Sequence, residues 1–340
     1  MAKLDGASIL ITGGTGSFGQ RFIATILERY KPRKIIVFSR DEAKQWDMSH
    51  DPVFADHSAL RFFIGDVRDR ERLLLAFRDV DFVVHAAALK HIPIAEYNPF
   101  ECIQTNVVGA ENVVAAAMHA GVQQVIALST DKAANPINLY GASKLAADKI
   151  FVAARHLVGR GGPTFAVVRY GNVVASRGSV VALFAKLIAQ RVKELPITDA
   201  RMTRFWITLQ QGADFVLSNL DIMQGGEIFV PRIPSMSVVD LAKAMAPNLP
   251  HRMVGIRPGE KLHEMMITED DARSTVELGD RYVILPSFAQ DRTFGGKERR
   301  VPEDFQYASN TNDQWMTPAD LLRMLRASGM DLPVMRDAAQ

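Results

Sequence analysis

The segment that most restricts how this chain can fold lies at its start, where an apolar run, a glycine-rich turn and a helical pattern follow one another between Ser8 and Arg29. A short apolar run of this kind is typical of a buried parallel strand. Glycines in the turn let the backbone approach a pyrophosphate, and the start of the next helix offers free N–H groups. Between a first strand and a first helix, this spacing predicts a dinucleotide site. The predicted contacts are Gly13, Thr15, Gly16, Ser17, Phe18 and Gly19.

Apolar runs and helical patterns continue to alternate through the first half of the chain. This alternation predicts an α/β fold, a doubly wound parallel sheet of the Rossmann type, with a smaller C-terminal substrate-binding lobe. We expect residues 1–170 to form the Rossmann domain, completed by 206–230, and residues 171–205 and 231–330 to form the lobe. Ser237 is expected to cap a helix over Val238–Met245. The expected strands are Ser8–Thr12, Lys34–Phe38, Leu60–Ile64, Phe82–Ala86, Val125–Leu128 and Phe165–Arg169.

The composition excludes several classes of protein. The chain has 340 residues and a formal net charge of +2, which gives no argument for nucleic acid or an anionic membrane as a partner. A single cysteine, Cys102, permits no disulfide within the chain and suits a reducing compartment. No apolar run approaches the roughly 18 residues of a membrane span. The early first strand leaves no room for a signal peptide, so we expect a cytoplasmic protein, and we assign no metal ligands.

The end of the second expected strand bears on the choice of cofactor. Enzymes that use NAD usually place an acidic residue there to bind the ribose hydroxyls. This chain has Ser39 and Arg40 at that point and Lys44 one turn later, and these cations suit the 2′-phosphate of NADP. Two alternatives stay open: Asp41 could bind the ribose, or the charges could be a solvated surface cluster. The predicted contacts here are Ser39, Arg40, Asp41, Lys44 and Gln45.

Three further segments are placed to reach the cofactor. A carboxylate after the third expected strand could hold the adenine edge. Small residues after the fourth strand would let the backbone come close, and the lysine that follows points either toward the site or toward solvent. A threonine and an asparagine lie on a helix behind the site. The predicted contacts are Asp66, Val67, Ala86, Lys90 and Thr105.

The run Ser129–Lys144 concentrates the chemistry. It follows an apolar strand, so Thr130, Asp131 and Lys132 should lie at the carboxyl end of that strand, where open α/β sheets bind their ligands. Tyr140 and Lys144 are spaced to share one face of the next helix. An ammonium beside a phenol lowers the phenol pKa, which predicts that Tyr140 can take a proton from a sugar hydroxyl.

These motifs together resemble the extended short-chain dehydrogenase/reductase family. More narrowly, the chain is similar to the inverting UDP-N-acetylglucosamine 4,6-dehydratases that begin pseudaminic acid synthesis. Lys132 after Asp131 is specific for that group, because retaining dehydratases carry a glutamate there and simple epimerases carry neither residue. A second inverting subgroup replaces the tyrosine with methionine, so Tyr140 argues against it. The segments that carry the likeness are Ser39–Gln45, His85–Pro99, Ser129–Lys144, Arg169–Asn172, Asp199–Trp206 and Arg257–Lys261.

The resemblance implies a reaction that these side chains can perform. Tyr140, held anionic by Lys144, takes the O4 proton while NADP accepts the C4 hydride, and Thr130 hydrogen-bonds O4. The C4 ketone makes C5–H acidic. Lys132, if it is neutral in a partly desolvated site, can then remove the C5 proton, and Asp131, if it is protonated, can give its proton to the departing C6 hydroxyl. Return of hydride to C6 and reprotonation of C5 on the opposite face complete the inversion.

The substrate side is predicted from the need to neutralise a diphosphate. Arg257 and Arg204 are the candidate cations, Asn172 could donate to a phosphate and Glu260 could bind the uridine ribose. Each of these residues has a surface role as its alternative. The resemblance also implies a homo-oligomer. The predicted substrate contacts are Lys90, Asn172, Val173, Thr198, Met202, Arg204, Arg257 and Glu260.

Other functions on the same frame remain to be weighed. A 4-epimerase needs no elimination, so Lys132 argues against it. A retaining dehydratase would carry another residue at that position. A non-catalytic NADP-binding regulator needs neither Tyr140 nor Lys144, and fold analogy alone would not exclude it.

Overall fold

The computed structural model describes residues 4–159, 161–174, 176, 178–330 and 332. The larger of the two parts of the molecule is built around a mostly parallel sheet. All strands predicted from the sequence are present, and their ends differ from the predicted ends by at most two residues. The parallel strands are β1 (Ser8–Thr12), β2 (Lys34–Ser39), β3 (Leu60–Ile64), β4 (Phe82–His85), β5 (Gln124–Thr130), β6 (Thr164–Tyr170) and β10 (Ile228–Pro231). β10 pairs with β6, so the predicted return of the chain to the main sheet is confirmed.

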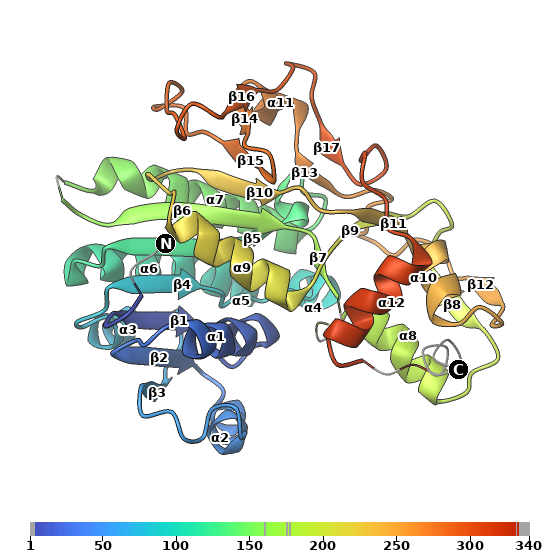
Figure 1. Cartoon of the computed structure of the whole chain (residues 1–340), viewed down its shortest axis with the longest axis horizontal. Helices are drawn as coiled ribbons and strands as arrows, with labels where there is room; N and C mark the ends of the chain where they lie inside the picture. Colours follow the sequence, from blue (N-terminus) through green and yellow to red (C-terminus); the bar gives the residue numbers. More distant parts are fainter. Residues whose placement is uncertain (1–3, 160, 175, 177, 331, 333–340) are drawn as a thin grey trace.

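Antiparallel strands extend this sheet at one edge. They are β14 (Thr275–Glu277), β15 (Arg281–Ile284) and β16 (Arg299–Arg300). Within the described residues the sheet has ten strands in the order β16-β14-β15-β10-β6-β5-β4-β1-β2-β3 (Figure 1). Residues 275–300 therefore lie with the main sheet, although the sequence analysis placed all of 231–330 in the lobe. β14 and β16 are too short and too polar to be recognised from an apolar run, whereas β15 contributes to the buried apolar run Tyr282–Leu285, which was not predicted as a strand.

Helices cover both faces of the sheet, as predicted for a doubly wound fold. α1 (Ser17–Arg29) and α9 (Leu209–Leu220) pack together in front of it in Figure 1, with α3 (Arg70–Ala76), α6 (Gly109–Ala120) and α7 (Leu139–Leu157) behind it. All five residues of β1 are buried, because both of its faces are covered. The remaining helical segments of this part are α2 (Glu42–His50), α4 (Ile92–Tyr97), α5 (Pro99–Ile103), the π-helical turn η1 (Gln104–Val108) and the 3₁₀ turn η2 (Asp131–Ala133).

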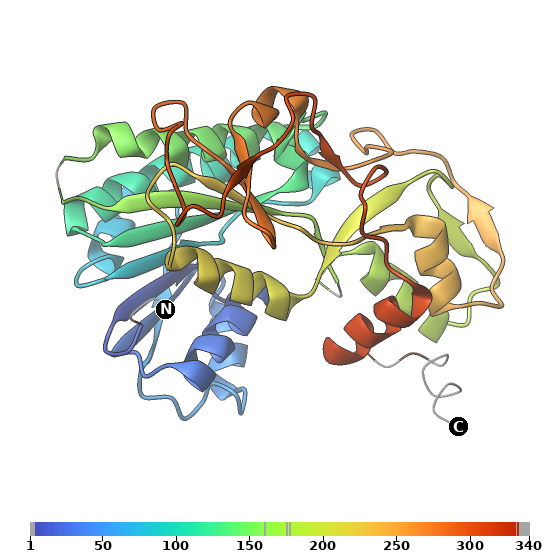
Figure 2. The same ribbon diagram turned by 45° about the horizontal axis from the view of Figure 1, so that its top comes forward.

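A smaller lobe with its own apolar cluster lies beside the sheet (Figure 2). Its buried side chains include Val181, Phe184, Leu241 and Leu321. Ser237 accepts a hydrogen bond of 2.9 Å from the N–H of Asp240, which confirms the predicted helix cap. The lobe contains α8 (Val180–Ala189), α10 (Val238–Met245), α12 (Pro318–Ala327), β7 (Asn172–Val173), β8 (Leu195–Ile197), β9 (Thr203–Ile207), β11 (Ser235–Ser237) and β12 (His251–Met253).

Three short elements connect the two parts: β13 (Met265–Ile267), α11 (Glu269–Ala272) and β17 (Tyr307–Ala308). β1, β4, β5 and β6 are neighbouring parallel strands, so their carboxyl ends lie side by side. Ligands bind at the carboxyl ends of the strands in folds of this kind. Among the described residues, no helix combines the length and apolar character that a bilayer crossing requires.

Candidate active site

The turn between β1 and α1 makes contacts that only glycine permits. Gly13 has a φ of +68°, and a Cβ on it would lie 2.9 Å from the backbone nitrogen of Ala87, in the loop after β4. A Cβ on Gly19 would lie 2.5 Å from the carbonyl oxygen of Gly14, so α1 packs directly on the turn. Gly16 caps α1 without a side chain to occupy its first N–H groups. Free N–H groups at the positive end of a helix suit a pyrophosphate, so these residues fit the predicted cofactor.

Other predicted residues of this turn connect it to the second strand. The hydroxyl oxygens of Thr15 and Ser39 lie 2.8 Å apart and both side chains are buried. Gln45 donates through Nε2 to the carbonyl oxygen of Ser39 at 2.9 Å. Ser17 is the first residue of α1, and the ring of Phe18 stacks on another aromatic ring of that helix at 5.5 Å. Phe18 therefore also has a packing role.

The cations predicted to bind a 2′-phosphate each have a carboxylate partner. Asp41 caps α2 by accepting from the N–H of Lys44 at 3.0 Å, and it also forms an ion pair with the Lys44 ammonium. Nη1 of Arg40 lies 3.6 Å from Oδ2 of Asp66, with the arginine side chain 52% exposed. Both cations lie just after β2, where the 2′-phosphate is predicted to bind. A phosphate bound there would compete with the carboxylates of Asp41 and Asp66 for these cations.

The residues after β3 are held by contacts within the protein. Burial raises the pKa of Asp66, but hydrogen bonds from Arg68 and the charges of Arg68 and Arg40 outweigh it, so its pKa lies below the ordinary value. Val67 is buried, and its carbonyl oxygen accepts from Nδ2 of Asn112 at 3.1 Å. Asp66 is thus a charged group at the predicted adenine edge, whereas Val67 is mainly a core residue.

The end of β4 is tied to β1 through a buried histidine. Oγ1 of Thr12 lies 2.8 Å from Nδ1 of His85, and the N–H groups of Ala86 and Ala87 donate to the same hydroxyl at 3.2 and 3.3 Å. Burial, with the charge of Lys144 adding to it, lowers the pKa of His85 to about 3. The imidazole is therefore neutral, and it fixes the backbone of Ala86 beside the phosphate turn.

A buried amide positions the loop that follows. Asn106, in η1, accepts from the N–H of Leu89 at 2.8 Å and donates to its carbonyl oxygen at 2.9 Å. The same amide donates to the hydroxyl of Ser143 on α7 at 2.9 Å. π-helical turns often occur at functional sites. The hydroxyl of Thr105, also in η1, is buried and has no hydrogen-bond partner among the described residues.

Thr130, Asp131 and Lys132 meet an acidic residue from a distant segment. Nζ of Lys132 lies 2.9 Å from Oδ1 of Asp131 and 3.2 Å from Oε1 of Glu264, and Thr130 donates to the same Asp131 oxygen at 2.9 Å. Burial raises the pKa of Asp131 more than Lys132 lowers it, which fits the predicted acid. Lys90 is exposed, and desolvation together with the charge of Lys132 lowers its pKa.

The role predicted for Lys132 depends on its being neutral. Burial disfavours its ammonium, but the carboxylates of Asp131 and Glu264 outweigh that cost and hold its pKa above the ordinary value. Lys132 is therefore charged in the resting site, so it must lose a proton before it can act as a base. Glu264 is a second counter-ion that the sequence analysis did not include.

Tyr140 and Lys144 lie one turn apart on α7, as predicted, but their electrostatics differ from the prediction. Burial raises the pKa of Tyr140 to about 12, against the charge of Lys132 and a hydrogen bond with Thr130. Nζ of Lys144 donates to the carbonyl oxygen of Leu128 at 2.7 Å, and burial lowers the pKa of Lys144. The expected lowering of the phenol pKa by Lys144 is therefore wrong here, because desolvation dominates.

A buried charged network lies behind these residues. Asp148 lies one turn after Lys144 on α7. It accepts from the hydroxyl of Ser129 at 2.8 Å and from Nη2 of Arg169 at 3.2 Å. Nη1 of Arg169 donates to the carbonyl oxygen of Met266 at 2.9 Å and lies 3.8 Å from Asp271. The network fixes α7 against β5, β6 and the connecting segment.

The predicted substrate residues near β7 and β9 take different positions. Asn172 and Val173 form β7 and are half-buried, and Thr198, just after β8, is also half-buried. Met202 is buried in the lobe core, so its predicted substrate contact conflicts with a packing role.

Arg204, the other candidate cation for the diphosphate, lies inside the protein. It is buried and donates to the carbonyl oxygens of Leu262 at 3.0 Å and Lys261 at 2.9 Å, and its Nε lies 3.6 Å from Oε1 of Glu264. The guanidinium thus has partners within the protein, and its contact with a phosphate stays a prediction. The fold creates this arrangement by placing a distant loop beside β9.

The segment with Arg257 and Glu260 lies against the start of the catalytic helix. Asn138 caps α7 by accepting from the N–H of Gly141 at 2.8 Å, and its Nδ2 donates to the carbonyl oxygen of Gly259 at 2.8 Å. Arg257 is exposed, and its Nη1 lies 3.6 Å from Oε1 of Glu260. These two predicted residues therefore lie close to each other and to α7.

Sequence reasoning missed several residues of this site, among them Asn138, Arg169 and Glu264. Asn138 has a local signal, since an asparagine directly before a helical pattern is a common cap. Arg169 and Glu264 carry no local signal for their roles, because their partners lie far away in the chain. A buried charge can be recognised from sequence only when its counter-ion is known.

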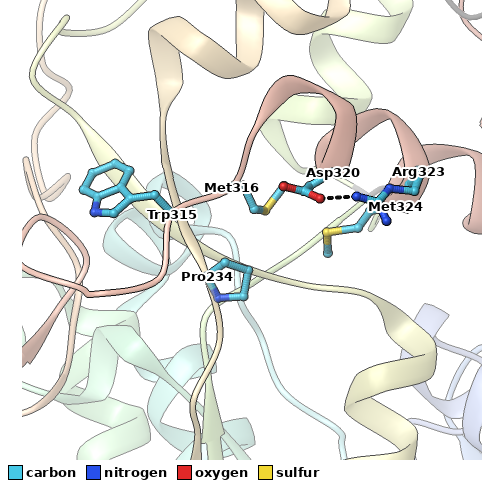
Figure 3. Close-up of a pocket in the computed structure, with 6 residues that line it drawn as sticks. All are labelled: Pro234, Trp315, Met316, Asp320, Arg323 and Met324. Carbon is cyan, nitrogen blue, oxygen red and sulfur yellow. Dashed lines mark hydrogen bonds and ion pairs between the residues drawn. The ribbon is translucent and has the colours of Figure 1, made fainter.

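A shallow hollow of about 250 Å³ lies in the lobe, between α12 and the start of β11 (Figure 3). Asp320 and Arg323 form an ion pair on its wall. No residue of the predicted site lines it, so we attach no catalytic role to it. The lining residues are Pro234, Trp315, Met316, Asp320, Arg323 and Met324.

Comparison with known proteins agrees with this architecture. Residues 9–286 match the family described as polysaccharide biosynthesis protein. A UDP-N-acetylglucosamine 4,6-dehydratase (inverting) of Campylobacter jejuni is 57% identical, covering 94% of this chain and 98% of the relative. A protein named UDP-glucose 4-epimerase from Rickettsia akari is 43% identical over 88% of this chain and 90% of its own length.

Solved structures show the same fold. Pen from Bacillus thuringiensis has a TM-score of 0.88 and 34% identity, covering 96% of this chain and 99% of its own. The dTDP-glucose 4,6-dehydratase DesIV from Streptomyces venezuelae has a TM-score of 0.66 and 24% identity, over 75% and 86% of the two chains. The likeness to DesIV, at 24% identity, concerns the fold alone. The chain belongs to the polysaccharide biosynthesis protein family, and within it to the extended short-chain dehydrogenase/reductase dehydratases.

Proposed function

We propose that this protein is a UDP-N-acetylglucosamine 4,6-dehydratase that inverts C5 and uses NADP. Its product is UDP-2-acetamido-2,6-dideoxy-β-L-arabino-hex-4-ulose, the first intermediate of pseudaminic acid synthesis. The observation that carries the proposal is the Asp131–Lys132 pair, whose oxygen and nitrogen lie 2.9 Å apart beside Tyr140 at the carboxyl end of β5. The 57% identical relative named for this reaction supports it.

The dinucleotide would lie on the turn Gly13–Gly19, with Thr15 and Ser39 nearby. When bound, it accepts the hydride of C4 and later returns a hydride to C6. The choice of NADP rests on Arg40 and Lys44, which would exchange their carboxylate partners for a 2′-phosphate.

The first task of the protein is to remove the O4 proton. Tyr140 is the base, and Thr130 lies beside it to hold O4. Because burial raises the pKa of Tyr140 to about 12, the free enzyme keeps the phenol protonated, and the phenol must release this proton to solvent before it can accept the proton of O4. Lys132 is the cation that opposes this effect most strongly, so the charge of Lys132 also bears on the oxidation step.

The second task is elimination of water across C5 and C6. The hydrogen bond between Lys132 and Asp131 lets the ammonium proton pass to the carboxylate, which leaves an amine and a carboxylic acid. The amine takes the C5 proton and the C5–H electron pair becomes the C5–C6 double bond. The C6–O bond breaks, and its oxygen leaves as water with the proton of Asp131. The pair ends as the ion pair seen in the structure.

One rival has a specific observation in its favour. The relatives from Rickettsia that are 43% identical are named UDP-glucose 4-epimerases. An epimerase needs Tyr140 and Lys144, but it has no use for an acid and a base at C6 and C5. The Asp131–Lys132 pair therefore favours the dehydratase.

A single incubation separates these reactions. The protein is mixed with NADP and UDP-N-acetylglucosamine in D₂O, and the product is read by NMR. We expect the L-arabino 4-keto-6-deoxy sugar with deuterium at C5, and a label placed at C4 should appear at C6. A D-xylo product as the first and only species would show a retaining enzyme, and a product with an intact C6 hydroxyl would show an epimerase.

We also propose a cytoplasmic homo-oligomer. The lone cysteine Cys102 is buried and suits a reducing compartment. Tyr97 and Phe100, at α4 and α5, are 86% and 77% exposed, and large apolar side chains gathered on a surface mark contact sites between subunits.

A further inference from the structure

Glu264 is a buried carboxylate that the reaction described above does not use. Only 2% of the surface of Glu264 is exposed to solvent. Its backbone is fixed on both sides by Ser309, because the N–H of Glu264 donates to the Ser309 hydroxyl at 2.9 Å and its carbonyl oxygen accepts from the Ser309 N–H at 2.8 Å. A charged side chain held this firmly inside a protein needs a partner, since burying a lone carboxylate is costly.

The side chain of Glu264 is directed at the catalytic pair. Oε1 lies 3.2 Å from Nζ of Lys132 and 3.6 Å from Nε of Arg204. Oε2 of Glu264 and Oδ2 of Asp131 are both buried, and neither has a hydrogen-bond partner among the described residues. Lys132 therefore lies between two carboxylates, each of which keeps one oxygen free.

The segment that carries Glu264 is also anchored to the catalytic loop. Nδ2 of Asn138 donates to the carbonyl oxygen of Gly259, and Nζ of Lys261 donates to that of Ala134. The Glu264–Lys132 contact is thus the third link between the same two segments. Of these three contacts, it is the one made to a side chain of the catalytic pair, Lys132.

We propose that Glu264 is a positioning residue of the elimination step: its carboxylate fixes the amino group of Lys132 beside Asp131 and sets the charge of that pair. This role rests on the proposed dehydratase function. Glu264 acts through Lys132, and the pair itself still supplies the acid and the base.

The electrostatic consequence has a definite sign. The charged groups that face Glu264 are Lys132 from η2, Arg204 from β9 and Lys261 from its own segment, and Asp131 lies beyond Lys132. The negative charge of Glu264 raises the pKa of both Asp131 and Lys132. Glu264→Gln removes that charge with little change in shape, so both pKa values fall. The pH range of elimination should therefore move to lower pH, by about one to three units for a charge this close.

The oxidation of C4 provides an internal control. Tyr140 responds to Lys132, Asp131 and Asp148, and Glu264 is not among the groups that shift its pKa. Glu264 can therefore act on Tyr140 only through the charge of Lys132, so in Glu264→Gln the pH profile for the appearance of reduced cofactor on mixing with substrate should shift less than that of elimination. The formation of 6-deoxy product should show the larger shift.

A second measurement does not depend on catalysis. Trace acetic anhydride acetylates neutral amines, and mass spectrometry reads the labelling of Lys132 relative to the exposed Lys149 of α7. Since each pKa unit changes the neutral fraction of the amine tenfold, Glu264→Gln should increase labelling of Lys132 by about tenfold or more. Glu264→Asp keeps the charge but moves it away by one methylene, so it should give smaller changes in the same direction. Glu269→Gln, at an exposed position nearby, makes the same charge change and should alter neither measurement.

The outcomes separate the two proposals. A wild-type elimination profile and wild-type labelling in Glu264→Gln would overturn the role of Glu264. If that variant does not fold, Glu264→Asp carries the test, and an unchanged profile and unchanged labelling overturn the role again. If the wild-type protein makes no 6-deoxy sugar, the proposed function fails, while the labelling still decides whether Glu264 controls the charge of Lys132.

Discussion

Asp148 holds the catalytic helix to the sheet through a buried ion pair, and Asp148→Asn tests how strongly. Nη2 of Arg169 lies 3.2 Å from Oδ2 of Asp148, with the two side chains only 3% and 2% exposed. Asparagine keeps the shape, and its amide oxygen still accepts from Ser129. The substitution removes the negative charge nearest to the guanidinium of Arg169. Breaking a buried pair costs about 3–5 kcal/mol, and Asp271 at 3.8 Å relieves part of it, so we expect a loss of about 3 kcal/mol.

The assay compares urea denaturation of the cofactor-free variants with that of the wild type. Asp214→Asn is the matched control, because Asp214 pairs with Arg29 at 2.7 Å but both side chains are almost half exposed. Exposed pairs contribute about 0–1 kcal/mol, so the control should lose no more than that. Equal losses in the two variants would refute the reasoning, since burial would then not decide the strength of the pair.

Three further predictions concern the site. Tyr140→Phe should lower turnover by about 10²-fold or more with cofactor binding intact, and near-normal turnover would mean that Tyr140 only packs. Arg40→Asp should weaken NADP binding more than NAD binding in titrations, and equal losses would remove the 2′-phosphate role. Burial lowers the pKa of His85 from 6.5 to about 3, so between these pH values the unfolded chain binds a proton that the folded protein does not. Stability should therefore decrease by about 1.4 kcal/mol for each unit by which the pH is lowered between these values, and His85→Gln should have a shallower slope in pH-dependent denaturation; equal slopes would contradict the assignment.

The parallel strands could be predicted from the sequence because both of their faces are buried. Continuous apolar runs such as those of β1 and β5 follow directly from that burial. The strands β14 and β16 gave no such signal, since they lie at the edge of the sheet and are short. The phosphate turn was predictable for another reason: its requirement for glycine comes from contacts with the backbone, which leave a local mark in the sequence.

The charges of the site could not be predicted in the same way. A pKa depends on which groups the fold brings near and on how much water it removes. Lys132 is charged because Glu264, from a distant segment, adds to Asp131. Tyr140 is protonated because burial outweighs its neighbouring cation. Arg204 has partners inside the protein because the fold places the segment at Lys261 against it. In each case the environment of the residue is set by long-range contacts, which leave no local mark in the sequence.

The two steps of the proposed reaction depend on different parts of the fold. Tyr140 and Lys144 lie on α7, which the buried Asp148–Arg169 pair fixes to the sheet. Lys132 is held partly by Glu264, which belongs to the segment that connects the sheet to the lobe. Changes in that segment should therefore disturb elimination more than oxidation at C4. An epimerase needs oxidation at C4 and return of the hydride to C4, but no elimination. One frame can thus serve both activities: they share Tyr140 and Lys144 on α7, whereas a dehydratase also needs the pair Asp131–Lys132 after β5, which the segment with Glu264 holds in place.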